Sequence, residues 1–205
     1  MKTSLFIALD GPKGTGKTTL AEAVTRALRA RGHTVIRLSE KANDPYRAET
    51  MVLVNALARK PSIALELEIC QRLALSRAWI SQHVLPKQPA GSIILIDRWY
   101  PSDAAFRRLI PFDEALRLNL ERQVRVPDLH VGVITDPELS WARAAARTRG
   151  LGSTVIQAFH EHAAATQAFE QAFVDHAWYL CRNDGPIEAA TLQVTAAIAE
   201  VMAKV

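Results

Sequence analysis

The sequence predicts one three-layer α/β domain built on a parallel sheet, and three observations support this prediction. The chain has 205 residues, which favours a single domain at roughly 150 residues per domain. Its hydrophobic fraction of 49% and charged fraction of 22% are those of a folded globular protein rather than a disordered one. Short apolar runs alternate with longer helical patterns, as they do when helices cover both faces of a sheet. We therefore expect one domain over residues 1–205.

Nearly continuous apolar character marks five segments as buried strands of a parallel sheet. They are Ser4–Leu9, Thr34–Leu38, Ser92–Ile96, His130–Thr135 and Trp178–Arg182. Helices are expected over Lys17–Arg31, which stops before Gly32, over Tyr46–Lys60 and Ser62–Val84, which Pro61 separates, and after Pro137. Ligands in this architecture bind beyond the carboxyl ends of the strands, so functional residues are expected there.

The net charge and the cysteine content indicate what kind of partner the protein binds and in which compartment it lies. The formal net charge of +4 favours an anionic partner, although no polybasic tail is present. Cys70 and Cys181 form neither a metal-type pair nor a disulfide framework, as expected in a reducing cytoplasm. No segment has the length of a membrane span or of a secretory leader, which predicts a cytoplasmic protein. The histidines lack metal-ligand spacing, because His160 and His162 would point to different faces of a helix, and we expect them at the surface.

The strongest motif follows the first predicted strand and opens the first predicted helix. Gly11-Pro-Lys-Gly-Thr-Gly-Lys17-Thr18 matches GxxxxGK[ST], in which backbone N–H groups and the helix dipole bind phosphates. Lys17 would reach the β- and γ-phosphates and Thr18 would ligate Mg²⁺. The residues expected to bind the cofactor ATP are Gly11, Lys13, Gly14, Thr15, Gly16, Lys17, Thr18 and Thr19. The alternative is a glycine-rich turn that binds nothing.

Among proteins with such a phosphate loop, a small kinase fits this sequence better than a motor protein or a guanine-nucleotide switch. No NKxD-type motif, which would read a guanine base, follows the later predicted strands. Phosphoryl transfer requires cations around the transferred group. Asp97 and Arg98 directly follow the third predicted strand, where Asp97 would hold Mg²⁺ through water and Arg98 would contact a phosphate of the acceptor. The alternative is a surface pair that caps the next helix.

Arginines near the end of the helix after Pro137 predict a short lid at about residues 143–154. Arg143 and Arg147 share one helix face, Arg149 lies at the edge of the following loop, and Gly150 and Gly152 would act as a hinge. Arg147 and Arg149 would act in catalysis and Arg143 in ATP binding. The alternative is a solvated arginine face that stabilises the helix C-terminus.

These motifs together resemble the thymidylate kinase family of nucleoside monophosphate kinases. The phosphate loop, Ser76-Arg77-Ala78, Asp97-Arg98-Trp99, Pro127-Asp128-Leu129 and the arginine-bearing lid each resemble a motif of that family. The resemblance implies a P-loop NTPase fold with a five-stranded parallel sheet flanked by helices, usually in a homodimer. It also implies an acceptor pocket formed by Arg77, Arg98 and Ser102, where Phe106 is expected as well. Trp99, which stands next to Arg98, could line that pocket.

The chain departs from the family pattern around that presumed pocket. Lys13 stands where the family's phosphate loop generally carries an acid, and Ser39-Glu40-Lys41-Ala42-Asn43 keeps only the glutamate of Arg-Glu-Pro-Gly-Gly. Ala105-Phe106-Arg107 replaces Ala-Tyr-Gln, so the groups that would read a thymine edge are lost. Because a charge in a binding pocket changes specificity, these departures predict an altered acceptor that Lys13, Glu40 and Arg107 would contact.

Three functions remain open at this point. The first is ATP-dependent phosphoryl transfer to a nucleotide or nucleotide-like acceptor. The second is transfer to a hydroxyl of a nucleoside, a small molecule or a hydroxylated base in DNA, with Glu40 as the base; Glu40 could equally be a loop carboxylate paired with Lys41 or Arg47. The third is a non-catalytic ATP-binding regulator with a decayed acceptor site.

Overall fold

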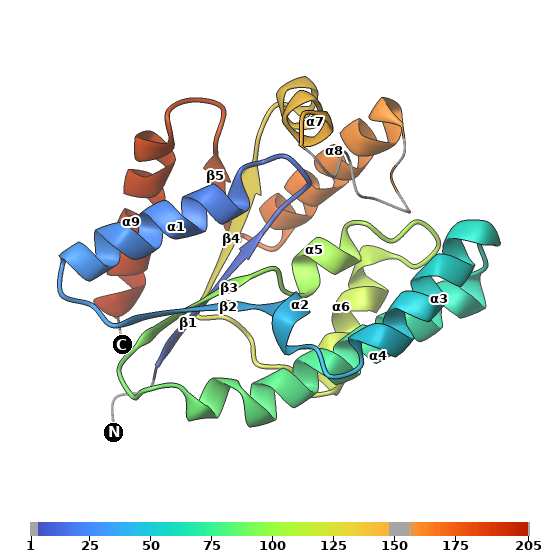
Figure 1. Cartoon of the computed structure of the whole chain (residues 1–205), viewed down its shortest axis with the longest axis horizontal. Helices are drawn as coiled ribbons and strands as arrows, with labels where there is room; N and C mark the ends of the chain where they lie inside the picture. Colours follow the sequence, from blue (N-terminus) through green and yellow to red (C-terminus); the bar gives the residue numbers. More distant parts are fainter. Residues whose placement is uncertain (1–3, 148–155, 157, 205) are drawn as a thin grey trace.

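The computed structural model describes residues 4–147, 156 and 158–204, and its centre is a five-stranded sheet (Figure 1). The strands are β1 (Leu5–Asp10), β2 (Val35–Ser39), β3 (Ile93–Asp97), β4 (Leu129–Ile134) and β5 (Tyr179–Arg182). They lie in the order β2-β3-β1-β4-β5, and every neighbouring pair is parallel. The predicted five-stranded parallel sheet is confirmed, with strand limits within two residues of those expected.

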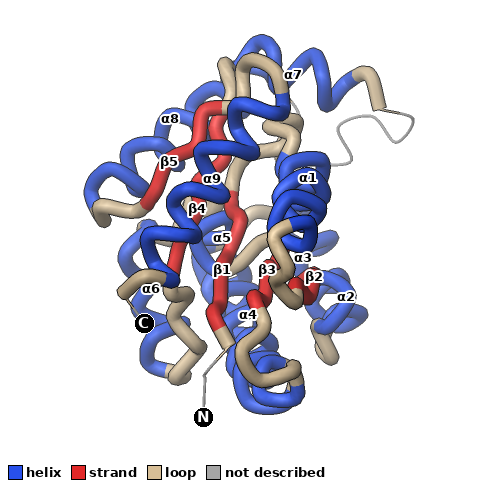
Figure 2. Tube along the Cα trace, turned by 90° about the vertical axis from the view of Figure 1, so that its left-hand side faces the viewer, coloured by secondary structure: helices blue, strands red, loops and turns tan. Residues whose placement is uncertain are grey.

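Helices cover both faces of the sheet, as the tube view shows (Figure 2). They are α1 (Lys17–Ala30), α2 (Glu40–Asn43), α3 (Arg47–Arg59), α4 (Ile63–His83), α5 (Tyr100–Ala104), α6 (Phe112–Glu121), α7 (Pro137–Ala145), α8 (Phe159–Asp175) and α9 (Ile187–Met202), with a 3-10 turn at Leu85–Lys87. On one face α1 and α9 pack together, and on the other lie α4, α5 and α8. The predicted three-layer architecture is therefore confirmed.

Alternation along β1 explains why both faces are filled. Leu5, Ile7 and Leu9 belong to the core beneath α1 and α9, while Phe6 and Ala8 belong to the core beneath α4 and α5. Successive side chains of a strand point to opposite faces. A strand that is buried on both faces must therefore be apolar throughout, which is the pattern from which the parallel sheet was predicted.

Two of the six histidines are buried. The prediction that the histidines lie at the surface is wrong for His130 and His162, which are 5% and 2% exposed. Each buried ring has a hydrogen-bond partner, Tyr100 for His130 and Ser140 for His162, and this offsets the cost of burial.

Both cysteines are buried and unpaired. Among the described residues, no helix is long and apolar enough to cross a membrane.

Candidate functional site

The phosphate loop, Gly11–Thr18, connects β1 to α1 at the carboxyl edge of the sheet. Gly14 and Gly16 have φ angles of 82° and 81°, a left-handed conformation that strains any other residue. A Cβ atom at Gly14 would also lie 1.8 Å from the backbone oxygen of Ser140. The loop glycines are thus required both by backbone conformation and by the close approach of α7.

Lys17 is buried within the loop it follows. Its Nζ donates hydrogen bonds to the backbone oxygens of Gly11 and Pro12 at 2.7 and 2.6 Å. Burial lowers the pKa of Lys17 well below its usual value, and the nearby Arg98 lowers that pKa further. The ammonium group therefore lies inside the loop in a cationic setting, where a phosphate would stabilise its charge.

A hydroxyl and a carboxylate meet at the junction of α1 and β3. Thr18 Oγ1 donates a hydrogen bond of 3.3 Å to Asp97 Oδ2, because the second residue of α1 faces the last residue of β3. Both groups are hard oxygen donors of the kind that Mg²⁺ prefers. Magnesium sites near nucleotides use one or two such protein ligands and complete the shell with water and phosphate oxygens. Thr18 and Asp97 therefore fit a Mg²⁺ ion.

Arg98 follows Asp97 in a strained conformation, with a φ angle of 75°. Its backbone N–H donates to Leu9 O at 2.9 Å, and its guanidinium donates to Gly11 O at 3.3 Å. A non-glycine residue at positive φ costs about 1–3 kcal/mol and is retained only where the surroundings fix it. These backbone and side-chain contacts hold Arg98 against the start of the phosphate loop.

A buried carboxylate, Asp10, joins the phosphate loop to α5. Asp10 Oδ1 accepts hydrogen bonds from the backbone N–H groups of Trp99 and Ser102 at 2.9 and 3.0 Å. Ser102 Oγ in turn accepts one from the N–H of Gly11 at 3.1 Å. Burial raises the pKa of Asp10, while the hydrogen bonds from Ser102 and Trp99 oppose that rise. The predicted site residue Ser102 thus lies directly against the phosphate loop.

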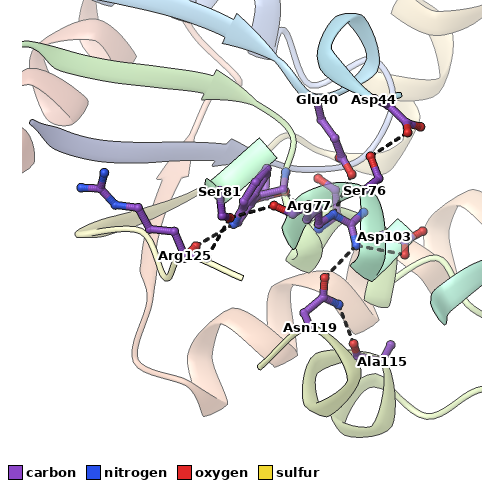
Figure 3. A network of polar contacts seen from close by, with 12 residues as sticks. Glu40, Asp44, Ser76, Arg77, Ser81, Asp103, Ala115, Asn119 and Arg125 are labelled. Carbon is purple, nitrogen blue, oxygen red and sulfur yellow. Dashed lines mark hydrogen bonds and ion pairs between the residues drawn. The ribbon is translucent and has the colours of Figure 1, made fainter. Parts of the chain in front are cut away.

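Beyond Arg98 lies a network of buried charges (Figure 3). Arg77, from α4, is 2.6 Å from Glu40 and 3.6 Å from Asp103, and it donates to Asn119 Oδ1 at 3.1 Å. Asp103 also pairs with Arg107. Burial raises the pKa of Glu40 to about 7 although Arg77 opposes the shift. Asp103 keeps a pKa below its usual value because Arg107 and Arg77 outweigh its burial.

One cavity of about 590 Å³ connects the phosphate loop to this network. The residues lining it are Lys13, Gly14, Gly16, Lys17, Thr18, Ser39, Glu40, Lys41, Asp44, Arg47, Leu73, Arg77, Asp97, Arg98, Trp99, Ser102, Asp103, Phe106, Arg107 and Arg147. Eight of them are lysine or arginine and four are acidic, a surplus of four cations. Its volume lies in the ordinary range for small-molecule sites.

The family model described as thymidylate kinase matches residues 9–193, which is most of the chain. The chain belongs to the thymidylate kinase family. Its relatives include the thymidylate kinase of Gluconobacter oxydans, 30% identical over 136 residues that make up 57% of this chain and 63% of that protein. That of Xanthomonas oryzae pv. oryzae is 33% identical over 117 residues, 56% and 50% of the two chains. That of Deinococcus radiodurans is 34% identical over 157 residues, 72% of each. In the first two comparisons the chain spans half to about two thirds of the relative's length.

Most residues that the resemblance to the thymidylate kinase family singled out border the cavity. Lys13 and Arg107, which depart from the family pattern, and Glu40, which the chain keeps, line it together with Arg77 and Arg98. Glu40 pairs with Arg77 rather than with Lys41 or Arg47, the partners weighed from the sequence. The departures therefore lie around one shared space.

Other predicted residues lie elsewhere. Trp99 borders the cavity as expected, while its indole is buried in the core and donates to Arg125 O at 3.0 Å, and its contact with an acceptor stays a prediction. Thr15 is buried in the loop and Thr19 is exposed on α1. Arg143 donates to Asn183 O at 3.1 Å. Arg149 and most of the predicted lid, residues 148–154, lie outside the described residues.

The sequence reasoning missed Asp10, Asp103 and Arg47 as site residues. Asp10 ends a strand directly before the phosphate loop, and this position alone could have marked it as a site residue. Asp103 stands four residues before Arg107 on a short helix, the spacing of an ion pair. Arg47 begins α3 and lines the cavity, but no local pattern indicates that this helix would point its first turn there.

Proposed function

We propose that this protein transfers the γ-phosphoryl group of ATP to a phosphate of a nucleotide or nucleotide-like acceptor. One observation carries the proposal: the cavity of about 590 Å³ runs without interruption from Lys17 and Thr18 to Arg77 and Asp103. A phosphoryl transferase must hold its two substrates in line within one water-excluding space. Membership of the thymidylate kinase family supports the same reaction class.

The charge of the cavity favours an anionic acceptor over a neutral one. Its surplus of four cations equals the formal net charge of the whole chain, +4. ATP bound to Mg²⁺ and a nucleotide monophosphate each carry about two negative charges near pH 7, given a second phosphate pKa of about 6. The surplus therefore neutralises both substrates together, while a neutral hydroxyl acceptor would leave part of it unused.

The side chains have distinct roles in this reaction. Lys17 binds the β- and γ-phosphates of ATP, Arg147 neutralises charge that develops during transfer, and Arg98 orients the acceptor phosphate. Thr18 and Asp97 would hold Mg²⁺, which supplies charge neutralisation between the phosphates when bound. No side chain needs to form a covalent intermediate, because catalysis rests on positioning and electrostatics.

The acceptor is proposed to differ from thymidylate. Lys13 brings a positive charge to the phosphate loop, and Arg107, which pairs with Asp103, places a charge where the family pattern has a glutamine. A substrate that cannot pair with a buried charge is rejected by several kcal/mol. The changes thus alter recognition of the acceptor and leave the ATP half of the site intact.

The test is a transfer screen with γ-labelled ATP and Mg²⁺ against nucleoside monophosphates, nucleosides and hydroxymethylpyrimidine DNA. We expect label on at least one monophosphate and loss of that signal in Lys17→Ala, with the circular dichroism spectrum unchanged. Unchanged turnover in Lys17→Ala would sink the assignment. ATP binding without transfer to any acceptor would instead support the non-catalytic regulator.

One observation favours a second candidate, transfer to a hydroxyl. Glu40 lines the cavity with a pKa of about 7, which suits a general base near neutral pH. In that case nucleosides or hydroxylated DNA would accept label in the screen and monophosphates would not.

The homodimer implied by the family resemblance and a cytoplasmic setting complete the proposal. The two buried, unpaired cysteines support a reducing compartment. Sedimentation equilibrium of the purified chain would give twice the 22.6 kDa mass of one copy if the dimer forms. A single species at the mass of one copy contradicts it.

A further inference from the structure

A buried serine on α7 is hydrogen-bonded to a buried histidine on α8, directly before the segment that carries Arg143 and Arg147. Ser140 Oγ and His162 Nε2 are 2.7 Å apart and hydrogen-bonded to each other. Ser140 is 0% exposed and His162 is 2% exposed. The ring of Trp141 lies 5.5 Å from that of His162, so the bond is formed in largely apolar surroundings, where it is stronger than in water.

The direction of this hydrogen bond follows from the number of protons available. Ser140 Oγ also donates to the backbone oxygen of Pro137 at 3.1 Å. A serine hydroxyl carries a single proton, so His162 Nε2–H is the donor to Ser140 Oγ. This hydrogen bond therefore requires an N–H donor at the end of side chain 162 and an acceptor oxygen on side chain 140.

Ser140 shares one stripe of α7 with Arg143, which follows it by three residues. Arg147 lies two residues beyond Ala145, the last residue of α7. Arg143 donates to Asn183 O at 3.1 Å, and Arg147 borders the cavity. A displacement of α7 would thus move Arg143 together with the start of the segment that carries Arg147.

The same stripe touches the phosphate loop. The backbone oxygen of Ser140 lies so close to Gly14 that a Cβ there would be 1.8 Å away. Asn183, which accepts from Arg143, donates through Nδ2 to Thr15 O at 2.8 Å. The position of α7 is in this way tied to the loop that is expected to hold the phosphates of ATP.

We propose that Ser140 and His162 are positioning residues, and that their hydrogen bond fixes α7 against the phosphate loop and thereby sets where Arg143 and Arg147 stand relative to the ATP phosphates. The inference rests on the proposed function, because it assigns these arginines to the phosphoryl donor. It goes beyond that function by naming two buried residues, distant from the acceptor pocket, on which the donor half of the site depends.

The test compares variants of residue 162 that differ only in their hydrogen-bonding group. His162→Gln keeps an N–H donor near the position of Nε2, while His162→Phe keeps a ring and loses the donor. We expect His162→Phe and Ser140→Ala to raise the KM for ATP, and the Kd of a fluorescent ATP analogue, by about 2- to 10-fold. His162→Gln should recover most of this loss, and the KM of the acceptor should not change in any variant.

The matched control is His160→Gln, which alters an exposed histidine in the first turn of the same helix and should behave as the wild type. The double variant Ser140→Ala/His162→Phe should lose no more affinity for ATP than the worse single variant. Equal behaviour of the Gln and Phe variants, or equal shifts in the KM of ATP and acceptor, would overturn the inference. Binding of the fluorescent ATP analogue is measured without turnover. A failure of this inference would show in the analogue binding of the variants, whereas a failure of the proposed function would show as no transfer to any acceptor.

Discussion

The carboxylate of Glu40 and the guanidinium of Arg77 lie 2.6 Å apart, and both residues line the cavity. Glu40 comes directly after β2 and Arg77 from the middle of α4, so the fold forms this ion pair between segments 37 residues apart in the chain. Burial raises the pKa of Glu40 to about 7 despite this partner. The carboxyl group therefore changes its charge near neutral pH.

The pH dependence of transfer depends on which acceptor is used. Below pH 7 Glu40 holds a proton and cannot act as a base, and above pH 7 it is ionised. A phosphate acceptor is already ionised and needs no base, so we expect Glu40→Gln to keep transfer to the best monophosphate within about 10-fold. The measurement is kcat against pH from 5.5 to 8.5. If the acceptor is instead a nucleoside or hydroxylated DNA, a loss of about 100-fold or more in Glu40→Gln, with wild-type activity rising up to pH 7, would identify Glu40 as the base of a hydroxyl kinase.

The hydrogen bond between Thr18 and Asp97 predicts a shared role in the magnesium requirement. We expect Thr18→Ala and Asp97→Asn each to raise the Mg²⁺ concentration for half-maximal activity by about 10-fold or more, as loss of groups around a metal does. The measurement is a Mg²⁺ titration at fixed ATP, with Thr34→Ala, an exposed threonine before β2, as control. Magnesium requirements that match the wild type in both variants would remove these two residues from the metal site.

The buried pair of Asp103 and Arg107 predicts coupled effects on stability. Removing one partner leaves the other charge buried with weaker compensation, whereas removing both takes away the charges of the pair together and leaves Arg77, which also contacts Asp103, paired with Glu40. In a double-mutant cycle of Asp103→Asn and Arg107→Gln, we expect a coupling of about 1–3 kcal/mol in the free energy of unfolding by urea. Additive effects would show that the pair contributes nothing through its contact.

The same double variant tests the altered acceptor. Neutral side chains at residues 103 and 107 remove the charge of Arg107, which we propose to penalise thymidylate, together with the charge of its partner Asp103. The ratio of kcat/KM for thymidine monophosphate to that for the best natural acceptor is therefore expected to rise by about 10-fold, the gain for about 1.4 kcal/mol of relieved penalty. A ratio that stays constant would place the specificity elsewhere, for example at Lys13.

Stability in acid should depend on His130, which lies outside the site. Burial lowers the pKa of His130 to about 3, while an unfolded histidine titrates near 6.5. The unfolded state therefore binds a proton that the native state does not, and stability falls as the pH drops from 6.5 towards 3.

Between pH 7.5 and 5.0 this histidine alone removes about 2 kcal/mol from the free energy of unfolding. His130→Gln retains a polar partner for Tyr100 and should lack that part of the loss. Urea unfolding at the two pH values measures it, and the same acid sensitivity in both proteins would contradict the assignment.

Local sequence patterns were sufficient for the sheet and for the phosphate half of the site. The five strands could be predicted because burial on both faces requires continuous apolar runs, and Gly11–Thr18 because its left-handed glycines and lysine spacing are local requirements. Asp97 and Arg98 could be placed because they end a strand, and every parallel strand delivers its end to the same edge of the sheet.

Tertiary structure alone decided which charges meet. Glu40 pairs with Arg77 rather than with its sequence neighbours, His162 is buried against Ser140, and the indole of Trp99 donates to Arg125 O within the core. Helix rotation and loop paths set these contacts, and both depend on packing summed over the whole domain rather than on any window of sequence. The sequence by itself therefore determined the fold and where phosphate would bind. Only the folded chain decided how the surrounding charges pair, and the acceptor depends on that pairing.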